Sequence, residues 1–289
     1  MAVVVVTDSS ARIPAEQVDK YAIHVVPLHI LVDGRDLRDG VDPVPTDLYQ
    51  RSHVTTAGAT PAELTAAYRQ ALQDSGGDGV VAVHISGALS STLGAAVYAA
   101  GEFGGSVLVV DSKSTAMGTG FVALAAAGAA QSGSGLDAVA AEAESMVGRV
   151  RSFIVVHRLD NLRRSGRIST AASWLGTALA LKPLLRIDEH GQLVLLARVR
   201  TASKAVAAMV EQVLAVVGEQ SAALAVHHIA NPDAAADVAA TLSAALPGCG
   251  EIVIADLGPV LGVHVGPGAL GVVAAIDDPP GAIRLSELE

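Results

Sequence analysis

The sequence predicts an α/β protein with a doubly wound parallel-sheet N-terminal domain and an α+β C-terminal domain. In the first half, short β-branched runs such as residues 3–6 and 107–110 alternate with helix patterns, which is typical of strands buried on both faces of a parallel sheet. From Arg151 onward, strand pairs separated by turns are mixed with helices. The 289 residues exceed the roughly 100 to 200 of one domain. We therefore expect domains at 1–150 and 151–289.

The first half begins with a strand at 3–6 that stops at the polar residues 7–10. Asp33-Gly34 predicts a hairpin turn after a strand region at 23–32. Thr60-Pro61 with Glu63 is a strong helix start. The other expected elements are a turn-rich loop at 54–61, a strand at 79–83, and helices at 92–100, 120–131 and 136–147.

In the second half we expect strands bracketing a turn at 188–191 and a long helix that opens at 200–204. Gly266, Gly268 and Gly271 fit a GxGxxG pattern, but a strand rather than a helix follows, so a dinucleotide site is rejected. The expected strands are 153–157, 181–187, 193–199, 222–227, 252–255 and 272–276, with a further helix at 233–246. Residues 257–271 are predicted to form a loop stiffened by proline and glycine.

Charge, cysteine content and hydropathy limit which partners and which cellular compartment are expected for this protein. A net charge of −10 without a large basic cluster makes nucleic acid an unsuitable partner. The single Cys249 forms no internal disulfide, and the N-terminus lacks the basic region of a secretory signal, so we expect a cytoplasmic protein. Mean hydropathy is high at +0.47, yet no apolar run reaches about 18 residues, so no stable membrane insertion is expected.

The turn between the strand at 79–83 and the helix at 92–100 is the leading candidate for a binding site. It carries Ser86, Ser90 and Ser91. Free N–H groups at a helix start carry partial positive charge, and small hydroxyls add donors, so a carboxylate or phosphate is a natural ligand. The alternative is that Ser90 or Ser91 only caps the helix.

Two further segments could bind anions, and each has a simpler interpretation. Residues 159–169 concentrate three arginines around Gly166, which could equally be a solvated loop. His264 lies beside backbone amides in the Gly- and Pro-rich segment. A single histidine in apolar surroundings is also common as a core or loop residue.

Taken together, several ordered motifs resemble the bacterial DegV family, whose members include the FakB fatty-acid-binding subunits of fatty acid kinase. The resemblance spans nearly the whole chain. Its motifs are Thr7-Asp8-Ser9-Ser10, Ile85-Ser86 with Leu89-Ser90, residues 109–115 with Met117-Gly118, Leu162-Arg163 with residues 165–169, Lys182-Pro183, residues 197–201 with Lys204-Ala205, and residues 262–268.

The resemblance implies two α/β domains that enclose a fatty acid, with its carboxyl group at the domain junction. The carboxyl contacts would be Thr56, Ser90 and His264. Ser91, Gly262 and Gly266 would support the binding loops, and Arg167 and Arg200 would face a partner kinase or the product phosphate. No metal and no cofactor other than the bound fatty acid is expected.

The chain departs from the family pattern in two places. Ala57-Gly58-Ala59 follows Thr56 where the family usually has Ser-Gln-Pro, and Ser91 replaces the glycine that usually follows the serine equivalent to Ser90. Thr56 is therefore placed by its neighbours, chiefly Thr60-Pro61, and Ser91 adds a hydroxyl beside Ser90.

The function expected from the resemblance is a fatty-acid carrier that presents the carboxyl group to a partner kinase, which phosphorylates it to acyl phosphate. A different hypothesis is a serine-dependent acyl hydrolase, with Ser90 as nucleophile, His264 as base and Asp8 or Asp111 as the orienting acid. No Gly-x-Ser-x-Gly motif surrounds Ser90. A third hypothesis is a binder of another acidic lipid or metabolite without a kinase partner.

Overall fold

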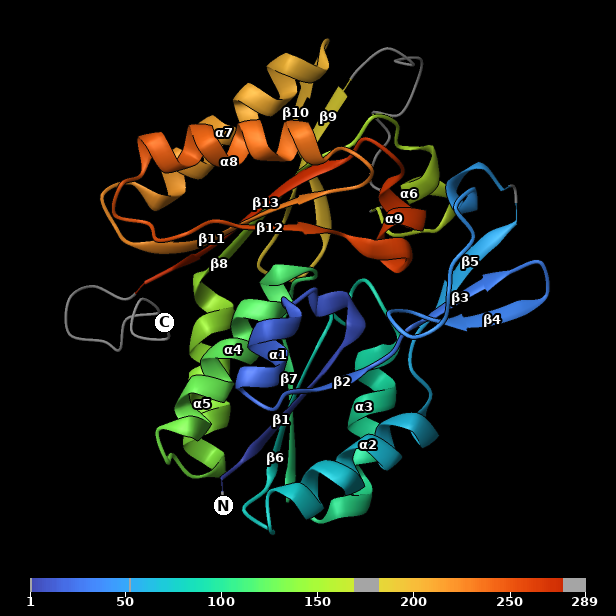
Figure 1. Ribbon diagram of the computed structural model, residues 1–289, viewed down its shortest axis with the longest axis vertical. Helices are drawn as coiled ribbons and strands as arrows, with labels where there is room; N and C mark the ends of the chain where they lie inside the picture. Colours follow the sequence, from blue (N-terminus) through green and yellow to red (C-terminus); the bar gives the residue numbers. More distant parts are fainter. Residues whose placement is uncertain (1, 52, 169–181, 278–289) are drawn as a thin grey trace. The chain divides into compact units, whose positions relative to one another are not determined.

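The computed structural model describes residues 2–51, 53–168 and 182–277, and the chain divides into two units, Met1–Gly148 and Arg149–Glu289 (Figure 1). Ser169 and Leu181, which we assigned to a motif and to a strand, lie outside the described residues. Each unit has its own sheets and its own buried core.

The first unit alternates strands with helices along the chain. Its elements are β1 (Val4–Asp8), η1 (Ser9–Ala11), α1 (Ala15–Lys20), β2 (His24–Val26), β3 (His29–Val32), β4 (Arg35–Arg38), η2 (Leu48–Gln50), β5 (Val54–Ala57), α2 (Pro61–Asp74), β6 (Val80–His84), α3 (Thr92–Ala100), η3 (Gly101–Phe103), β7 (Val107–Asp111), α4 (Met117–Gln131) and α5 (Leu136–Arg149).

The main sheet of this unit has the order β2-β1-β6-β7, and all its strands run parallel. Figure 1 shows α4 and α5 on one side of these strands and α2 and α3 on the other. Every residue of β6 is buried, as expected for a central strand covered on both faces. The predicted α/β class with a parallel N-terminal sheet is confirmed.

A small antiparallel sheet, β4-β3-β5, projects from the same unit. Asp33 and Gly34 adopt left-handed φ angles of 51° and 71°, and Val32 pairs with Arg35, which confirms the predicted two-residue hairpin. The expected single strand region at 23–32 instead forms β2 and β3 in two different sheets. Pro27 separates them, because its fixed φ and missing N–H interrupt strand pairing.

His29 connects this small sheet to α2. Its Nδ1 lies 2.7 Å from Asp36 Oδ1 on β4, and its Nε2 lies 3.2 Å from Glu63 Oε2 in the first turn of α2. Burial opposes protonation of His29, but the hydrogen bonds and charges of Asp36 and Glu63 outweigh it, so the pKa of His29 is raised.

Helix α2 begins as the sequence predicted. Thr60 Oγ1 accepts a hydrogen bond from the Glu63 N–H at 3.3 Å, and Glu63 Oε2 accepts one from the Thr60 N–H at 2.8 Å. This capping box satisfies two backbone donors that the first helical turn leaves free. It also fixes where the segment from β5 enters the helix.

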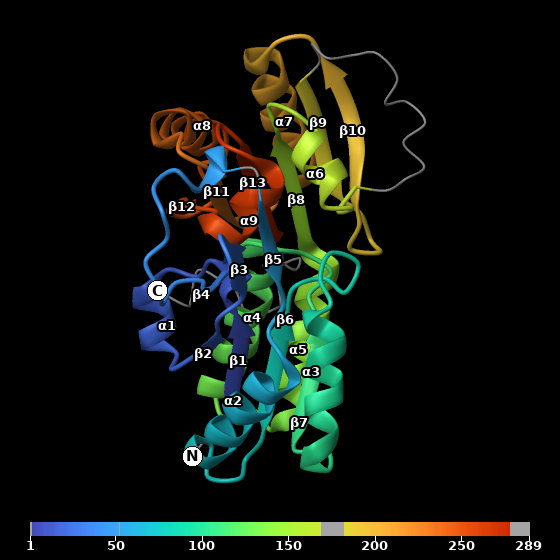
Figure 2. The same ribbon diagram turned by 90° about the vertical axis from the view of Figure 1, so that its right-hand side faces the viewer.

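The second unit is a mixed sheet covered by helices, which agrees with the predicted α+β character. Its order is β10-β9-β8-β13-β11-β12, with only β11 and β12 parallel among the described pairs. Figure 2 shows β8, β9 and β10 side by side. The elements are β8 (Val150–Val155), α6 (Asp160–Arg164), β9 (Lys182–Ile187), β10 (Leu193–Val199), α7 (Ala202–Val217), β11 (Ala222–His228), α8 (Pro232–Ala245), β12 (Val253–Asp256), α9 (Gly258–Val265) and β13 (Leu270–Ile276).

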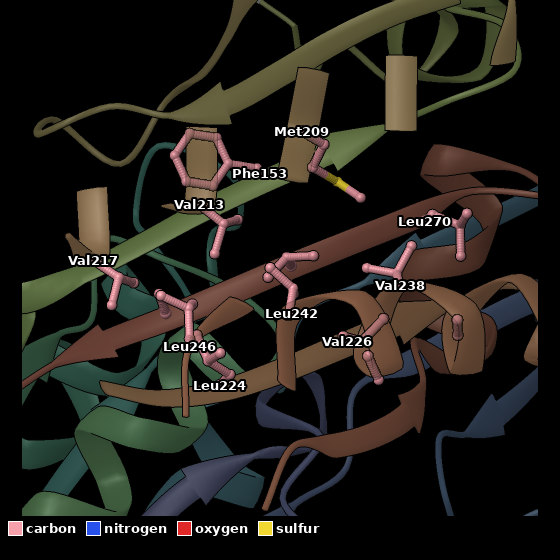
Figure 3. Close-up of a cluster of buried hydrophobic side chains, with 14 of the residues drawn as sticks. Phe153, Met209, Val213, Val217, Leu224, Val226, Val238, Leu242, Leu246 and Leu270 are labelled. Atoms are coloured by element: carbon pink, nitrogen blue, oxygen red, sulfur yellow. The ribbon is translucent and has the colours of Figure 1, made fainter. Parts of the chain in front are cut away.

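The core of this unit lies between the sheet and helices α7 and α8 (Figure 3). Met209 and Val213 from α7 and Leu242 from α8 are fully buried against strand residues such as Leu224 and Val226. The apolar positions of α7 recur at helical spacing, so one face of the helix enters the core.

Candidate functional site

Three neighbouring parallel strands of the first unit end in polar residues and lead into hydroxyl-rich turns. Strands β1, β6 and β7 end at Asp8, His84 and Asp111. His84 pairs directly with Asp111 across the sheet. Because parallel strands end at the same edge, this edge is where open α/β sheets bind ligands. The segments that follow are Ser9–Ala11, residues 85–91 and residues 112–116.

The turn after β6 places Ser90 at the start of α3. The N–H groups of Leu89 and Ser90 donate to the Ser86 carbonyl at 2.9 and 3.0 Å. Ser90 Oγ accepts from the Thr92 N–H at 3.2 Å and lies 2.9 Å from Thr92 Oγ1. Ser90 is half-buried and Ser91 is exposed. Ser91 occupies the N-cap position without a side-chain capping bond, so the capping interpretation applies in part to Ser90 and not to Ser91.

Thr92 is a residue that sequence reasoning missed. Its side chain is fully buried and bonded to Ser90, so it fixes the orientation of the Ser90 hydroxyl. The only signal in the sequence was a hydroxyl residue two positions after Ser90, at the first position of the predicted helix. Serine and threonine are common at helix starts because they cap the helix, so this signal did not point to a contact with Ser90.

Thr56 lies in strand β5, not in the loop that we expected at 54–61. It pairs with Ile30 of β3 and is half-buried. Two residues later, a Cβ atom added to Gly58 would lie only 2.6 Å from Thr92 Oγ1 and 3.2 Å from Thr92 N. The segment that leaves β5 therefore packs directly on the start of α3. The structure thus brings the end of the Thr56 strand against the Ser90–Thr92 turn.

A fully buried chain of hydrogen bonds lies behind this edge of the sheet. Tyr68 Oη lies 2.9 Å from His84 Nε2, and His84 Nδ1 lies 3.0 Å from Asp8 Oδ2. Asp8 also accepts from the Ile85 N–H at 3.0 Å and from the Ser10 N–H and hydroxyl at 3.1 and 2.5 Å. Burial would raise the pKa of Asp8, but the hydrogen bonds from His84, Ser10 and Ile85 and the nearby His84 charge lower it overall.

These contacts bear on the two candidate acids of the hydrolase hypothesis. Both carboxyl oxygens of Asp8 are engaged by His84, Ser10 and Ile85. Asp111 Oδ1 accepts from the Lys113 N–H at 2.8 Å. Asp111 therefore has a local role in its own turn, whereas Asp8 also bonds to the end of β6.

In the second unit, His264 lies in the last turn of α9 and not in the expected loop. The Gly266 N–H donates to the Gly262 carbonyl at 2.8 Å and closes this helix. Gly266 has a φ of 79°, and a Cβ atom there would lie 2.9 Å from Asn161 Nδ2 of α6. Gly266 therefore lies directly against α6 in a left-handed conformation, which explains the glycine at this position, and Gly262 supplies the carbonyl that closes α9.

The pKa of His264 is lowered to about 4, first because burial disfavours the charged imidazolium and second because the Arg167 guanidinium repels it. Arg167 follows the turn at Gly166, whose φ is 70°, and its guanidinium donates to the Ser165 carbonyl. At pH 7 the His264 imidazole is therefore neutral and offers one N–H donor and one acceptor nitrogen.

Arg200 directly follows β10. The end of β10 and the end of β8, which leads into the segment with α6, both lie beside the start of β9. The preceding residue, Val199, pairs with Lys182, and Lys182 Nζ donates to the His157 carbonyl just beyond β8 at 3.3 Å. Arg200 is exposed. The segments that carry Arg167 and Arg200 therefore start from neighbouring strand ends.

Among the residues that the structure describes, no group of three or more His, Cys, Asp or Glu side chains is arranged to hold a metal ion. Within residues 2–51, 53–168 and 182–277, no helix is long and apolar enough to cross a membrane.

The fold and the site define a two-unit α/β protein whose first unit gathers hydroxyl-bearing turns at the carboxyl edge of a parallel sheet. The family described as "Uncharacterised protein, DegV family" matches residues 2–277. A DegV domain-containing protein of Mycobacterium tuberculosis (strain H37Rv) is 59% identical over 282 residues, which cover 98% of this chain and 100% of the relative. The chain belongs to the DegV family, as its motifs predicted.

Several solved structures resemble nearly the whole chain, among them two from Thermus thermophilus and Bacillus subtilis. One is titled "Fatty Acid Binding of a DegV family Protein from Thermus thermophilus" and has a TM-score of 0.89 at 32% identity, covering 96% of this chain and 100% of its own. The other, DegV of Bacillus subtilis, is titled a fatty acid binding protein and has a TM-score of 0.85 at 30% identity, with coverage of 96% and 100%. The expected DegV-like fold is confirmed.

Proposed function

We propose that this protein binds a long-chain fatty acid and that the hydroxyls of Ser90 and Thr56 contact its carboxylate. The observation that carries this proposal is the Ser90 hydroxyl, which accepts from the Thr92 N–H at the start of α3. When the Thr92 hydroxyl also donates to Ser90 Oγ, which lies 2.9 Å away, the Ser90 proton can be given to an anionic acceptor. A charge-assisted hydrogen bond of this kind is stronger than a neutral one. The fatty-acid binding stated for the Thermus thermophilus and Bacillus subtilis relatives supports the choice of ligand.

His264 is proposed as a further contact of the carboxylate, and this assignment rests on the family motif at residues 262–268. As a neutral imidazole with a pKa of about 4, it would donate one N–H without adding a positive charge. The His264→Ala variant is therefore measured separately from Ser90→Ala.

We further propose that the protein is a carrier rather than a catalyst, and that a partner fatty acid kinase phosphorylates the bound carboxyl group. Arg167 and Arg200, whose segments leave neighbouring strand ends, are the residues assigned to the kinase or to the product phosphate. Arginine suits this role because its planar guanidinium binds phosphate oxygens in pairs.

The ligand proposal is tested by titrating oleate or palmitate into the purified protein and measuring Kd by isothermal titration. Ser90→Ala removes one charge-assisted hydrogen bond, so affinity should fall by roughly 10- to 100-fold, and His264→Ala should weaken binding at least as much. The control is Ser106→Ala, an exposed serine in the turn before β7, at the other end of that strand from the site. Unchanged affinity in both Ser90→Ala and His264→Ala would contradict the site assignment.

The carrier proposal is tested with ATP and a bacterial fatty acid kinase subunit. Arg167→Ala should keep the affinity for fatty acid and slow acyl phosphate formation, whereas Arg151→Ala, an exposed arginine at the start of β8, should change neither. A hydrolase would instead turn over p-nitrophenyl esters and be labelled at Ser90 by a fluorophosphonate. Turnover that Ser90→Ala abolishes would overturn the carrier proposal.

A further inference from the structure

Asp8, His84 and Tyr68 form a buried polar chain that the proposed carboxylate contacts do not use. Each of the three side chains has no exposed surface. Ionisable groups at such depth are costly unless they are paired and hydrogen-bonded. Here two of them, Asp8 and His84, are the last residues of the two central strands, which are otherwise mostly valine and alanine. A polar chain retained in such a core suggests a role beyond packing.

The proton positions in this chain follow from its chemistry. Asp8 is a carboxylate and only accepts, so His84 Nδ1 carries a proton and donates to it. The Tyr68 hydroxyl, which remains protonated because burial and the Asp8 charge raise the pKa of Tyr68, lies 2.9 Å from His84 Nε2. Every polar atom of His84 is then satisfied, and its ring has one orientation.

The Asp8 carboxylate joins two of the turns at the carboxyl edge of the sheet. One oxygen accepts from the N–H and hydroxyl of Ser10, in the turn after β1. The other accepts from His84 and from the Ile85 N–H, the first residue after β6. Ile85 leads directly to Ser86, whose carbonyl accepts from the Ser90 N–H. Asp8 thus fixes the origin of the turn that ends at Ser90.

We propose that Asp8 and His84 are positioning residues for the Ser90 turn: they hold the Ile85 backbone so that Ser90 is preorganised for its anionic ligand. This inference rests on the proposed function for the ligand and extends it to residues that do not contact that ligand. A preorganised donor binds more tightly because less ordering accompanies association.

A pair of substitutions at His84 separates positioning from bulk stability. In His84→Asn the amide nitrogen occupies the place of Nδ1 and keeps the donor to Asp8. In His84→Gln the amide lies near Nε2 and that donor is lost. Both variants remove the ring, so both should lower Tm. We expect His84→Gln and Asp8→Asn to weaken oleate binding by about 10-fold, the loss expected for one charged hydrogen bond, and His84→Asn to retain most of the wild-type affinity.

Val139→Ala serves as the stability control, because Val139 is fully buried in α5 and belongs to none of the site segments. It should lower Tm without changing Kd for oleate. Hydrogen exchange of residues 85–91 in the ligand-free protein supplies a readout that needs no ligand: it should accelerate in Asp8→Asn and His84→Gln but not in Val139→Ala.

Equal oleate affinity and equal exchange in His84→Asn and His84→Gln would overturn the inference, as would loss of affinity in Val139→Ala. If wild-type protein binds no oleate, the proposed function fails, and the exchange rates alone then decide whether Asp8 and His84 hold the turn.

Discussion

Gly58→Ala tests the packing of the segment from β5 on the start of α3. The added methyl would lie 2.6 Å from Thr92 Oγ1, 3.2 Å from Thr92 N and 3.4 Å from Ser91 Oγ. The helix backbone has little room to move, so the buried Thr92 side chain must rotate and release Ser90 Oγ. Overpacking of this kind costs about 1–3 kcal/mol. We expect the free energy of unfolding to fall by about 2 kcal/mol on that basis.

Gly94→Ala is the matched control, because it adds the same methyl within α3 where no atom beyond the adjoining residues and the helix's own backbone lies within 4 Å. Alanine is favoured over glycine in helices, by about 0.8–1.0 kcal/mol in the interior. Gly94 lies in the first turn of α3, so this variant should be at least as stable as wild type. Urea unfolding measures both changes, and titration with oleate should show weakened binding for Gly58→Ala alone. A Gly58→Ala protein with wild-type stability and affinity would refute the contact between these segments.

Three further predictions concern capping and charge. Thr60→Ala removes the capping box with Glu63 and should destabilise the protein by about 1 kcal/mol in urea unfolding, an effect that Thr60→Ser should largely reverse. Because the pKa of His29 is raised in the folded protein, its stabilising contribution is complete below the unfolded pKa of about 6.5 and is lost as pH rises through the folded value. The stability difference between wild type and His29→Gln should therefore shrink with rising pH, and a difference that grows would contradict the ion pairs. In Arg167→Ala, NMR titration should find the pKa of His264 above about 4 yet still below its usual value, because burial remains; an unchanged pKa would contradict their proximity.

Local signals in the sequence predicted the elements whose chemistry is local. The Asp33-Gly34 hairpin, the Thr60 capping box and the bounds of α3 agree with the structure because each depends on residues within a few positions. The buried β-branched runs predicted the parallel sheet for the same reason. These features required no knowledge of distant partners.

Where a feature depends on residues distant in the sequence, our prediction was wrong or the feature was missed. Thr56 is in a strand because β5 pairs with β3, more than twenty residues earlier in the sequence. His264 is in a helix although Gly258 and Gly262 weaken the helix pattern. Helix α9 packs against α6, and tertiary packing of this kind supports short helices. The bond between Asp8 and His84 spans 76 positions, so only the sheet topology brings them together.

The central claim, that this chain binds a fatty acid, is tested most directly by what the purified protein carries. Protein prepared under native conditions should yield, on organic extraction and mass spectrometry, long-chain fatty acid at close to one molecule per chain. Delipidated protein should regain thermal stability with added oleate, by about 2.7 kcal/mol when free oleate is a hundredfold above Kd. Extracts without fatty acid, together with an unchanged Tm in the presence of oleate and palmitate, would contradict the account.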